Sequence, residues 1–207
     1  MDSLRLTIET DLSRIDARQW DALAGDQPFL RHAFLRAMHE TGCAARETGW
    51  APHYLALWRD GALAAATPLY LKSHSRGEYV FDHAWADAFQ RHGMRYYPKL
   101  LSAIPFTPVT GPRLLAASDE DRATLVRGLV AFAEEIKVSS LHLVFPADAD
   151  MRVLRDAGFM IRESVQFHWI NADYADFDAF LAAMSHDKRK KIRQDRKKVA
   201  AAGLSYR

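Results

Sequence analysis

Residues 187–198, near the end of the chain, carry eight Lys or Arg side chains and only two acids. A segment with a net charge of +6 cannot enter a hydrophobic core, because unpaired charges are far too costly to bury. On a helix, Ile192 and Val199 would form a thin apolar seam about 20° wide. We therefore expect a helix over about 186–202 that projects from the rest of the fold.

The same stretch concentrates positive charge on one helical face. The whole chain has a formal net charge of only +2, so the residues outside this stretch sum to −4. At 100° per residue, five cations fall within an arc of about 120°: Arg189, Lys190, Arg193, Arg196 and Lys197. Such a face suits phosphate, since Arg offers paired donors and Lys a point charge. Arg189, Lys190, Arg193 and Lys197 are our phosphate-binding candidates, and a solvated helix without a ligand is the alternative.

The rest of the chain alternates between strand and helix patterns. Periodicity predicts strands at 4–10, 54–58, 63–71, 140–145 and 159–171, and helices at 17–23, 28–41, 80–92, 118–137 and 148–157. Asp60-Gly61 predicts a hairpin turn, and the proline-rich segment 104–115 predicts an edge strand or a loop. We expect a helix that docks on a core at 177–184 and the start of a further strand at 204–207. This order predicts an α/β fold with a sheet of about six strands, flanked by helices.

Several function classes are excluded by what the sequence lacks. The glycines are too widely spaced for a Gly-rich nucleotide loop, and no nucleophile elbow, zincin or C-x-x-C motif occurs. Cys43 is the only cysteine, so there is no internal disulfide and no thiolate zinc cluster. No apolar run reaches the roughly 18 residues of a membrane span, and the first residues lack a signal-peptide pattern. We expect a cytoplasmic protein without a metal.

Two loops hold an unusual density of functional groups and are the best candidates for a site. The candidate substrate-binding residues are Lys72, His74, Glu78, Tyr79, Asp82 and His83 in the first loop, and Phe106, Thr107 and Arg113 in the proline-rich second loop. The alternative is a structural loop whose histidines are satisfied by the backbone.

Two histidines on expected strands are candidates for acid–base catalysis. His142 alternates with leucines, while Gln166 and His168 share one face of the strand expected at 159–171. If these strands are neighbours, His142, Gln166 and His168 could meet and serve a proton transfer. The alternative is that each histidine is a hydrogen-bonded structural residue.

Several long segments resemble a known family: PLYLKSHSRGEYVFDHAWADAF, YYPKLLSAIPFTPVTGPRLL, SSLHLVFP, QFHWIN and KRKKIRQDRKKV. They are similar to the FemAB-like family of N-acyltransferases, linked to peptidoglycan biosynthesis or recognition, from about Trp20 to Arg207. The resemblance implies two tandem GNAT-like α/β domains. This chain would be the N-terminal half, with a GNAT-like domain at 1–175 and a basic linker helix at 176–207 leading toward a second domain.

The resemblance also implies a reaction, the transfer of an acyl or aminoacyl group to an amine. Related enzymes use aminoacyl-tRNA, and simpler GNAT proteins use acyl-CoA; both donors are rich in phosphate. This sequence lacks the [QR]-x-x-G-x-[GA] turn of acetyl-CoA binders. As one half of a cleft between two domains, the chain alone is expected to be a weak catalyst. The alternative function is a non-catalytic module that binds an anionic glycan precursor or RNA.

Overall fold

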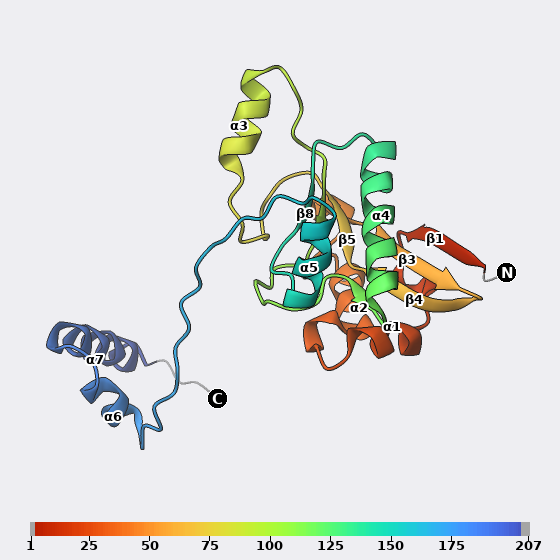
Figure 1. Ribbon diagram of the computed structural model, residues 1–207. Helices are drawn as coiled ribbons and strands as arrows, with labels where there is room; N and C mark the ends of the chain where they lie inside the picture. Colours follow the sequence, from red (N-terminus) through yellow and green to blue (C-terminus); the bar gives the residue numbers. More distant parts are fainter. Residues whose placement is uncertain (1–2, 204–207) are drawn as a thin grey trace. The chain divides into compact units, whose positions relative to one another are not determined.

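The structure, a computed structural model, describes residues 3–203. The chain divides into two compact units between Ile161 and Arg162. The first unit holds every strand that the described residues form, and the second consists of an irregular segment followed by two helices (Figure 1). The expected boundary at 175/176 between a GNAT-like domain and a linker helix stays a prediction.

The first unit contains two four-stranded sheets. One has the order β1-β3-β4-β7, formed by β1 (Leu4–Glu9), β3 (Tyr54–Arg59), β4 (Ala62–Thr67) and β7 (Leu115–Ala116), all antiparallel. The other has the order β2-β5-β6-β8, formed by β2 (Trp50–Pro52), β5 (Leu69–Lys72), β6 (Lys99–Ser102) and β8 (Leu141–Leu143), with β6 and β8 parallel. The mixed α/β class is confirmed, but the strands form two sheets instead of one.

Proline 68 explains why one expected strand became two. The sequence predicts a single strand over 63–71, but β4 ends at Thr67 and β5 begins at Leu69, in different sheets. A proline has no N–H to donate to a ladder, so it interrupts pairing at that point. The hairpin between β3 and β4 is confirmed, with Asp60 and Gly61 both at positive φ, as a tight primed turn requires.

The first unit contains five helices and, before β2, three single-turn 3-10 segments. The helices are α1 (Ala17–Ala24), α2 (His32–Glu40), α3 (His83–Arg91), α4 (Asp119–Glu135) and α5 (Asp148–Asp156); the 3-10 turns are Leu12–Arg14, Pro28–Leu30 and Arg46–Thr48. All five fall where the periodicity predicts helix, although the expected helix at 28–41 is split between a 3-10 turn and α2.

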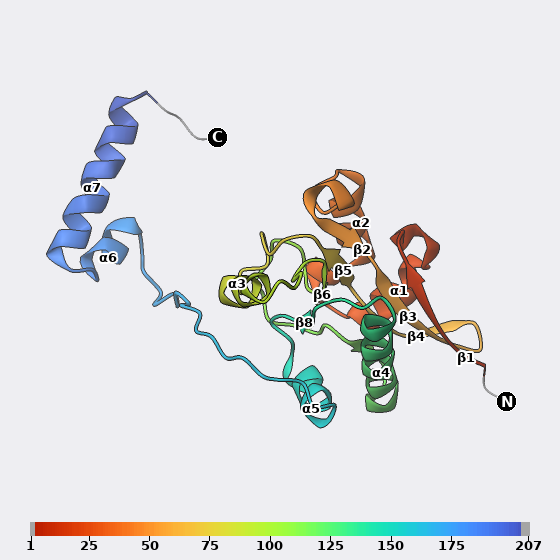
Figure 2. The same ribbon diagram turned by 90° about the horizontal axis from the view of Figure 1, so that it is seen from above.

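Strand β3 separates two halves of the core, because successive side chains point to opposite faces. Tyr54 and Ala56 belong to the cluster that contains residues of α1 and α2. Leu55 and Leu57 belong to the cluster built from α4 and α5, which includes Leu125. Figure 2 shows the corresponding layers, with α1 and α2 on one side of the strands and α4 on the other.

The second unit contains α6 (Phe177–Ala182) and α7 (His186–Ala201). Leu181 of α6 is buried, whereas α7 has no buried residue. Ile192 and Val199 are half-buried and Arg193 is exposed, as the thin apolar seam predicts. The strand expected at 204–207 lies outside the described residues.

One expected strand is wrong. Within the described residues, 159–171 forms no strand, and the apolar side chains of Val165, Phe167 and Ile170 are exposed. An alternating pattern shows that a segment can pair with a strand. A ladder also needs pairing with a neighbouring strand, and neither sheet formed by the described residues includes this segment.

Ser118 begins the longest helix and gives a test of its capping. Its Oγ accepts a hydrogen bond from the Asp121 N–H at 3.1 Å and donates to the Asp121 carboxylate at 2.8 Å. Ser118→Ala should lower the free energy of unfolding by about 1 kcal/mol, measured by urea denaturation. The control is Thr124→Ala, whose hydroxyl donates to the Glu120 carbonyl and accepts from Arg127, both within the same helix, and whose loss should cost little. Equal effects of the two variants would contradict the capping role.

Candidate functional site

Two buried lysines face each other on neighbouring strands at one end of the second sheet. Lys72 of β5 pairs with Trp50 of β2 on one side and with Lys99 of β6 on the other. Directly paired residues point to the same face of a sheet, so these three side chains form a row. Both lysines are fully buried. Two ammonium groups in such positions repel each other, and they require acids close by.

The acids come from the loop that follows β5. Lys99 Nζ donates to Glu78 Oε2 at 2.8 Å and also to Asp82 Oδ2. Both carboxylates are buried, and among the described residues Glu78 Oε1 and Asp82 Oδ1 have no hydrogen-bond partner. Lys72, Glu78, Asp82 and Lys99 together form what we call the ionic cluster.

Lys72 is the least satisfied member of the ionic cluster. Its Nζ lies 3.5 Å from the centroid of the Trp50 ring and donates to the Arg76 carbonyl at a distance of 3.4 Å. Burial lowers the pKa of Lys72 to about 7, because the favourable charge of Glu78 is outweighed by desolvation together with the charge of Lys99. Burial also raises the pKa of Glu78, against the effect of Lys99. Both shifts favour the neutral forms, the free amine of Lys72 and the protonated carboxyl of Glu78.

A hydrogen-bonded path connects the ionic cluster to His142. The Tyr96 hydroxyl donates to Asp82 Oδ2 at 2.8 Å and lies 3.3 Å from His142 Nε2. The same ring nitrogen lies 2.8 Å from Ser140 Oγ. Burial raises the pKa of Asp82, but hydrogen bonds from Lys99, Ser75 and Tyr96 outweigh burial and leave the pKa below its usual value. Asp82 is therefore a carboxylate at neutral pH.

The two candidate loops meet at Phe106. Gly77 has a φ of +80°, and a Cβ at this position would lie 2.5 Å from the Phe106 ring. The Phe106 ring in turn packs on Trp50, with centroids 5.3 Å apart. Only glycine permits this approach, so the loop after β5 and the proline-rich loop lie together beside the ionic cluster. That these loops form a substrate site stays a prediction.

Arg113 holds the proline-rich loop in place. Its buried guanidinium donates to the carbonyls of Val109, Gly111, Pro112 and Val144 at 2.7–3.2 Å. Burial lowers its pKa to about 10, with Asp150 acting in the opposite direction. Thr107 caps the same loop by donating to the Pro105 carbonyl. These contacts occupy Arg113 and Thr107 within the loop.

Three predicted residues of the first loop lie outside the ionic cluster. His74 is half-buried, and its Nδ1 accepts from the Arg76 N–H at 3.2 Å. Burial lowers the pKa of His74, and the charges of Lys72 and Arg76 lower it further. Tyr79 is exposed, and His83 is exposed at the start of α3.

Gln166 and His168 belong to the second unit, where both are exposed. Their expected meeting with His142 required a strand at 159–171, which the described residues do not form. Their roles as substrate-binding and catalytic residues stay predictions.

On α7, the predicted phosphate-binding residues line a single pocket of about 280 Å³. It is lined by Arg189, Lys190, Arg193 and Lys197 together with His186 and Gln194. Arg189 also donates to the Ala182 carbonyl of α6 at 3.2 Å, so it ties the two helices together. We call Arg189, Lys190, Arg193 and Lys197 the basic face.

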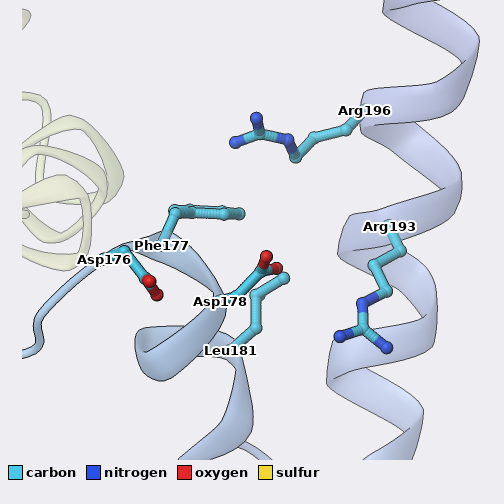
Figure 3. A pocket seen from close by; sticks show the side chains of 6 residues that line it. All are labelled: Asp176, Phe177, Asp178, Leu181, Arg193 and Arg196. Atoms are coloured by element: carbon cyan, nitrogen blue, oxygen red, sulfur yellow. The ribbon is translucent and has the colours of Figure 1, made fainter.

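A second pocket of about 340 Å³ lies between α6 and α7, lined by Asp176, Phe177, Asp178, Leu181, Arg193 and Arg196. Figure 3 shows the Arg196 guanidinium above the Phe177 ring. Arg196 Cζ lies 4.2 Å from the centroid of this ring. Arg196 thus faces α6, which explains why the fifth cation of the expected arc does not line the pocket of the basic face.

Over residues 11–207 the sequence matches the family described as FemAB-like, peptidoglycan biosynthesis/recognition. The chain belongs to the FemAB-like family. The FemAB-like chain has no match among curated protein sequences. Among its described residues, no group of three or more His, Cys, Asp or Glu side chains could hold a metal ion, and no helix is long and apolar enough to cross a membrane.

Two solved structures are similar to the FemAB-like chain. One is an aminoglycoside N-acetyltransferase in complex with CoA, 10% identical, with a TM-score of 0.49 over 83% of this chain and 97% of that chain. The other is the ribosomal-protein-alanine N-acetyltransferase from Brucella melitensis biovar Abortus 2308, 14% identical, with a TM-score of 0.46 over 82% of this chain and 100% of that chain.

Sequence reasoning missed three residues of the site: Trp50, Tyr96 and Lys99. Trp50 and Lys99 lie at the starts of strands of three and four residues, too short for periodicity to reveal. Lys99 directly before the apolar residues 100–101 would signal such a site only if it is buried, because a buried lysine needs an acidic partner.

The lowered pKa of Lys72 predicts a pH dependence of stability. Because the folded pKa of about 7 lies below the unfolded value, the unfolded state binds more protons between pH 7 and about pH 10. The free energy of unfolding should therefore rise as pH increases through this window. Below the window, the folded protein bears the full cost of holding the buried Lys72 amine in its charged form. In Lys72→Met the rise should be absent.

Urea denaturation at pH 6, 8 and 9.5 measures this effect. The free energy of unfolding of Lys72→Met minus that of the wild type should be largest at pH 6 and should decrease as pH rises. Lys137→Met, at an exposed position, should show a constant difference at all three values. A constant difference for Lys72→Met would show that Lys72 is charged throughout.

Proposed function

We propose that this FemAB-like protein acts in N-acyl transfer, the movement of an acyl or aminoacyl group to an amine, with this chain as the N-terminal half of the enzyme. The observation that carries the proposal is the family match, which spans residues 11–207. The family description connects the chain with peptidoglycan, and amines are the groups that acylation would modify on a peptidoglycan precursor.

The proposed reaction needs a base beside the acceptor amine. The amine nitrogen attacks the acyl carbonyl carbon, a C–N bond forms, and the C–S or C–O bond to the donor breaks. The proton lost by the amine passes to the base, and the donor leaves as a thiol or an alcohol. His142 is the base that we favour, because it is connected by hydrogen bonds to Tyr96 and to the carboxylate of Asp82.

The two loops supply the proposed acceptor side. Glu78 and Asp82 provide buried carboxylate oxygens without partners among the described residues, and these suit a substrate ammonium group. Phe106 is partly exposed beside Trp50 and can cover an apolar part of the substrate. His74, Tyr79 and His83 extend the same loop toward solvent.

The proposed donor is acyl-CoA or aminoacyl-tRNA, which share phosphate chemistry. The basic face offers four cations on one pocket, and guanidinium and ammonium groups are the usual phosphate partners in proteins. The donor and acceptor would be cytoplasmic, and a second GNAT-like domain would complete the cleft. No metal takes part in this scheme.

The proposed reaction can be tested by turnover. The purified protein, incubated with acyl-CoA or charged tRNA and a peptidoglycan precursor that bears a free amine, should release thiol or uncharged tRNA slowly. His142→Gln should reduce the rate at least 100-fold, the usual contribution of a general base. His168→Gln is the comparison, because both histidines were catalytic candidates.

The alternative function gives a different result. A non-catalytic module would bind the precursor or RNA without product formation, and both histidine variants would behave like wild type. If His142→Gln forms product at the rate of the wild type, the protein is a transferase in which His142 is not the base.

The basic face is tested by a charge-matched pair of variants. Lys190→Gln/Arg193→Gln/Lys197→Gln should weaken binding of tRNA or CoA and flatten its salt dependence, by about 0.7 in log–log slope per lost contact for a single strand. Arg189 is left in place because it bonds to α6. The control removes the same charge from the other side of α7: Lys188→Gln/Lys191→Gln/Lys198→Gln.

Filter binding or calorimetry at two salt concentrations measures both variants. Stability should change little in either, because exposed charges contribute little to folding. Equal weakening by the two variants would indicate a general effect of net charge, and unchanged binding in both would leave α7 as a solvated helix.

A further inference from the structure

The second unit carries an aromatic pocket that the proposed function does not use. The pocket has a volume of about 430 Å³ and is lined by four aromatic side chains and one amide: Trp169, Asn171, Tyr174, Phe177 and Phe180. Small-molecule sites usually have volumes of about 300–1,000 Å³. Trp169 is 66% exposed, so its large ring is open to a ligand. We call this the aromatic pocket.

The rings of the aromatic pocket support one another. Trp169 and Tyr174 each pack edge-on against Phe180, with centroids 6.0 Å and 5.4 Å away. Trp169 and Tyr174 are nearly parallel, with centroids 6.4 Å apart. A flat group between these two rings would need two contact distances of about 3.5 Å each, or about 7 Å in all. A planar ligand group would therefore stack on the solvent-exposed side of Trp169.

Asn171 adds a hydrogen-bonding group to the aromatic pocket. Its side-chain amide has a carbonyl acceptor and an NH₂ donor side by side. Adenine offers the matching pair, a donor on N6 next to the N7 acceptor, whereas guanine presents two acceptors, O6 and N7, on the same edge. An amide beside an open indole ring therefore suits adenine in preference to guanine.

The aromatic pocket continues into the two pockets of α6 and α7. Phe177 lines both the aromatic pocket and the pocket between α6 and α7, and Arg193 lines both the latter and the pocket of the basic face. The middle pocket also contains the Asp178 carboxylate, which Figure 3 shows directed toward α7. Carboxylates in nucleotide sites accept hydrogen bonds from ribose hydroxyls. The order along this surface is thus aromatic rings, a carboxylate and then cations.

We propose that the second unit binds an adenine nucleotide on this surface. The base stacks on Trp169 and bonds to Asn171. The ribose hydroxyls donate to Asp178, and the phosphates bind Arg193 and the rest of the basic face. The order of base, ribose and phosphate in a nucleotide is the order of the matching groups on the protein. Asp176 has a different role, because its Oδ1 accepts from the Ala179 N–H at 2.7 Å and caps α6.

Both proposed acyl donors contain this chemical group. CoA carries an adenosine with phosphates, and tRNA ends in an adenosine. The link between the nucleotide site and the acyl donor rests on the proposed N-acyl transfer, whereas binding of a nucleotide is a property of the protein without any reaction.

Calorimetric titration of the full chain with ADP, GDP and inorganic pyrophosphate tests the site. ADP should bind about tenfold more tightly than GDP, because a paired base edge contributes about that much, and more tightly than pyrophosphate, which has no base. Asn171→Ala should bind ADP and GDP equally. Equal affinity of the wild type for ADP and pyrophosphate, or no detectable binding of ADP, would overturn the proposal.

Two aromatic residues of one segment provide a matched pair of variants. Trp169→Ala should weaken ADP binding about tenfold, since stacking on an aromatic ring contributes about that much per base. Its binding of pyrophosphate should not change, which also shows that the basic face remains folded. Phe167→Ala should bind ADP like the wild type, because Phe167 is 98% exposed and is not among the residues that line the aromatic pocket. Equal losses of ADP affinity in both variants would refute stacking on Trp169.

Competition against bound ADP separates the nucleotide site from the proposed function. Displacement by CoA, or by an RNA oligonucleotide that ends in adenosine, would support the site and identify the donor. If ADP binds as expected and neither compound displaces it, the nucleotide site is supported and its link to these donors is wrong. Nucleotide binding without any transfer activity would support the site and reject the N-acyl transfer.

Discussion

The repulsion between two buried ammonium groups, Lys72 and Lys99, governs how one end of the second sheet is built. The register of β5 and β6 places these side chains opposite each other, where like charges are unfavourable even in water. The fold accommodates the two lysines because the loop after β5 places the carboxylates of Glu78 and Asp82 beside Lys99. The same loop makes the close approach of Gly77 to Phe106, and its Asp82 accepts the hydrogen bond from Tyr96.

A buried ion pair is a poor source of stability, since desolvation offsets most of the attraction. Apolar residues at the same four positions would pack at least as well. Packing alone therefore does not account for two lysines and two acids at these positions, where two carboxylate oxygens have no partner among the described residues. The nearly neutral pKa of Lys72 follows from its burial and from the charge of Lys99 beside it.

The sequence predicted the fold well where signals are local, and less well where they are not. The helices follow from periodicity and capping, and the loop residues Lys72, Glu78 and Asp82 were selected because polar groups were concentrated around one glycine. Lys99 and Tyr96 were not predicted because their acidic partners lie 14 to 21 residues away along the chain, and no local sequence pattern reveals a contact over such a separation. The prediction of a strand at 159–171 was wrong for a related reason, since an alternating pattern does not show whether a segment pairs with another strand.

The parallel pairing of β6 with β8 has a consequence for how the protein acquires its site during folding. Residues 103–140, including all of α4, separate these two strands, and a parallel connection cannot close until such a crossover is complete. Contacts of this separation form slowly, because the entropy of the long loop is lost before the strands gain from pairing. Lys99 and its acids can associate earlier, since they are separated by a shorter stretch of chain. The pairing that places His142 beside Tyr96 therefore costs more loop entropy than the contacts of Lys99 with its two acids.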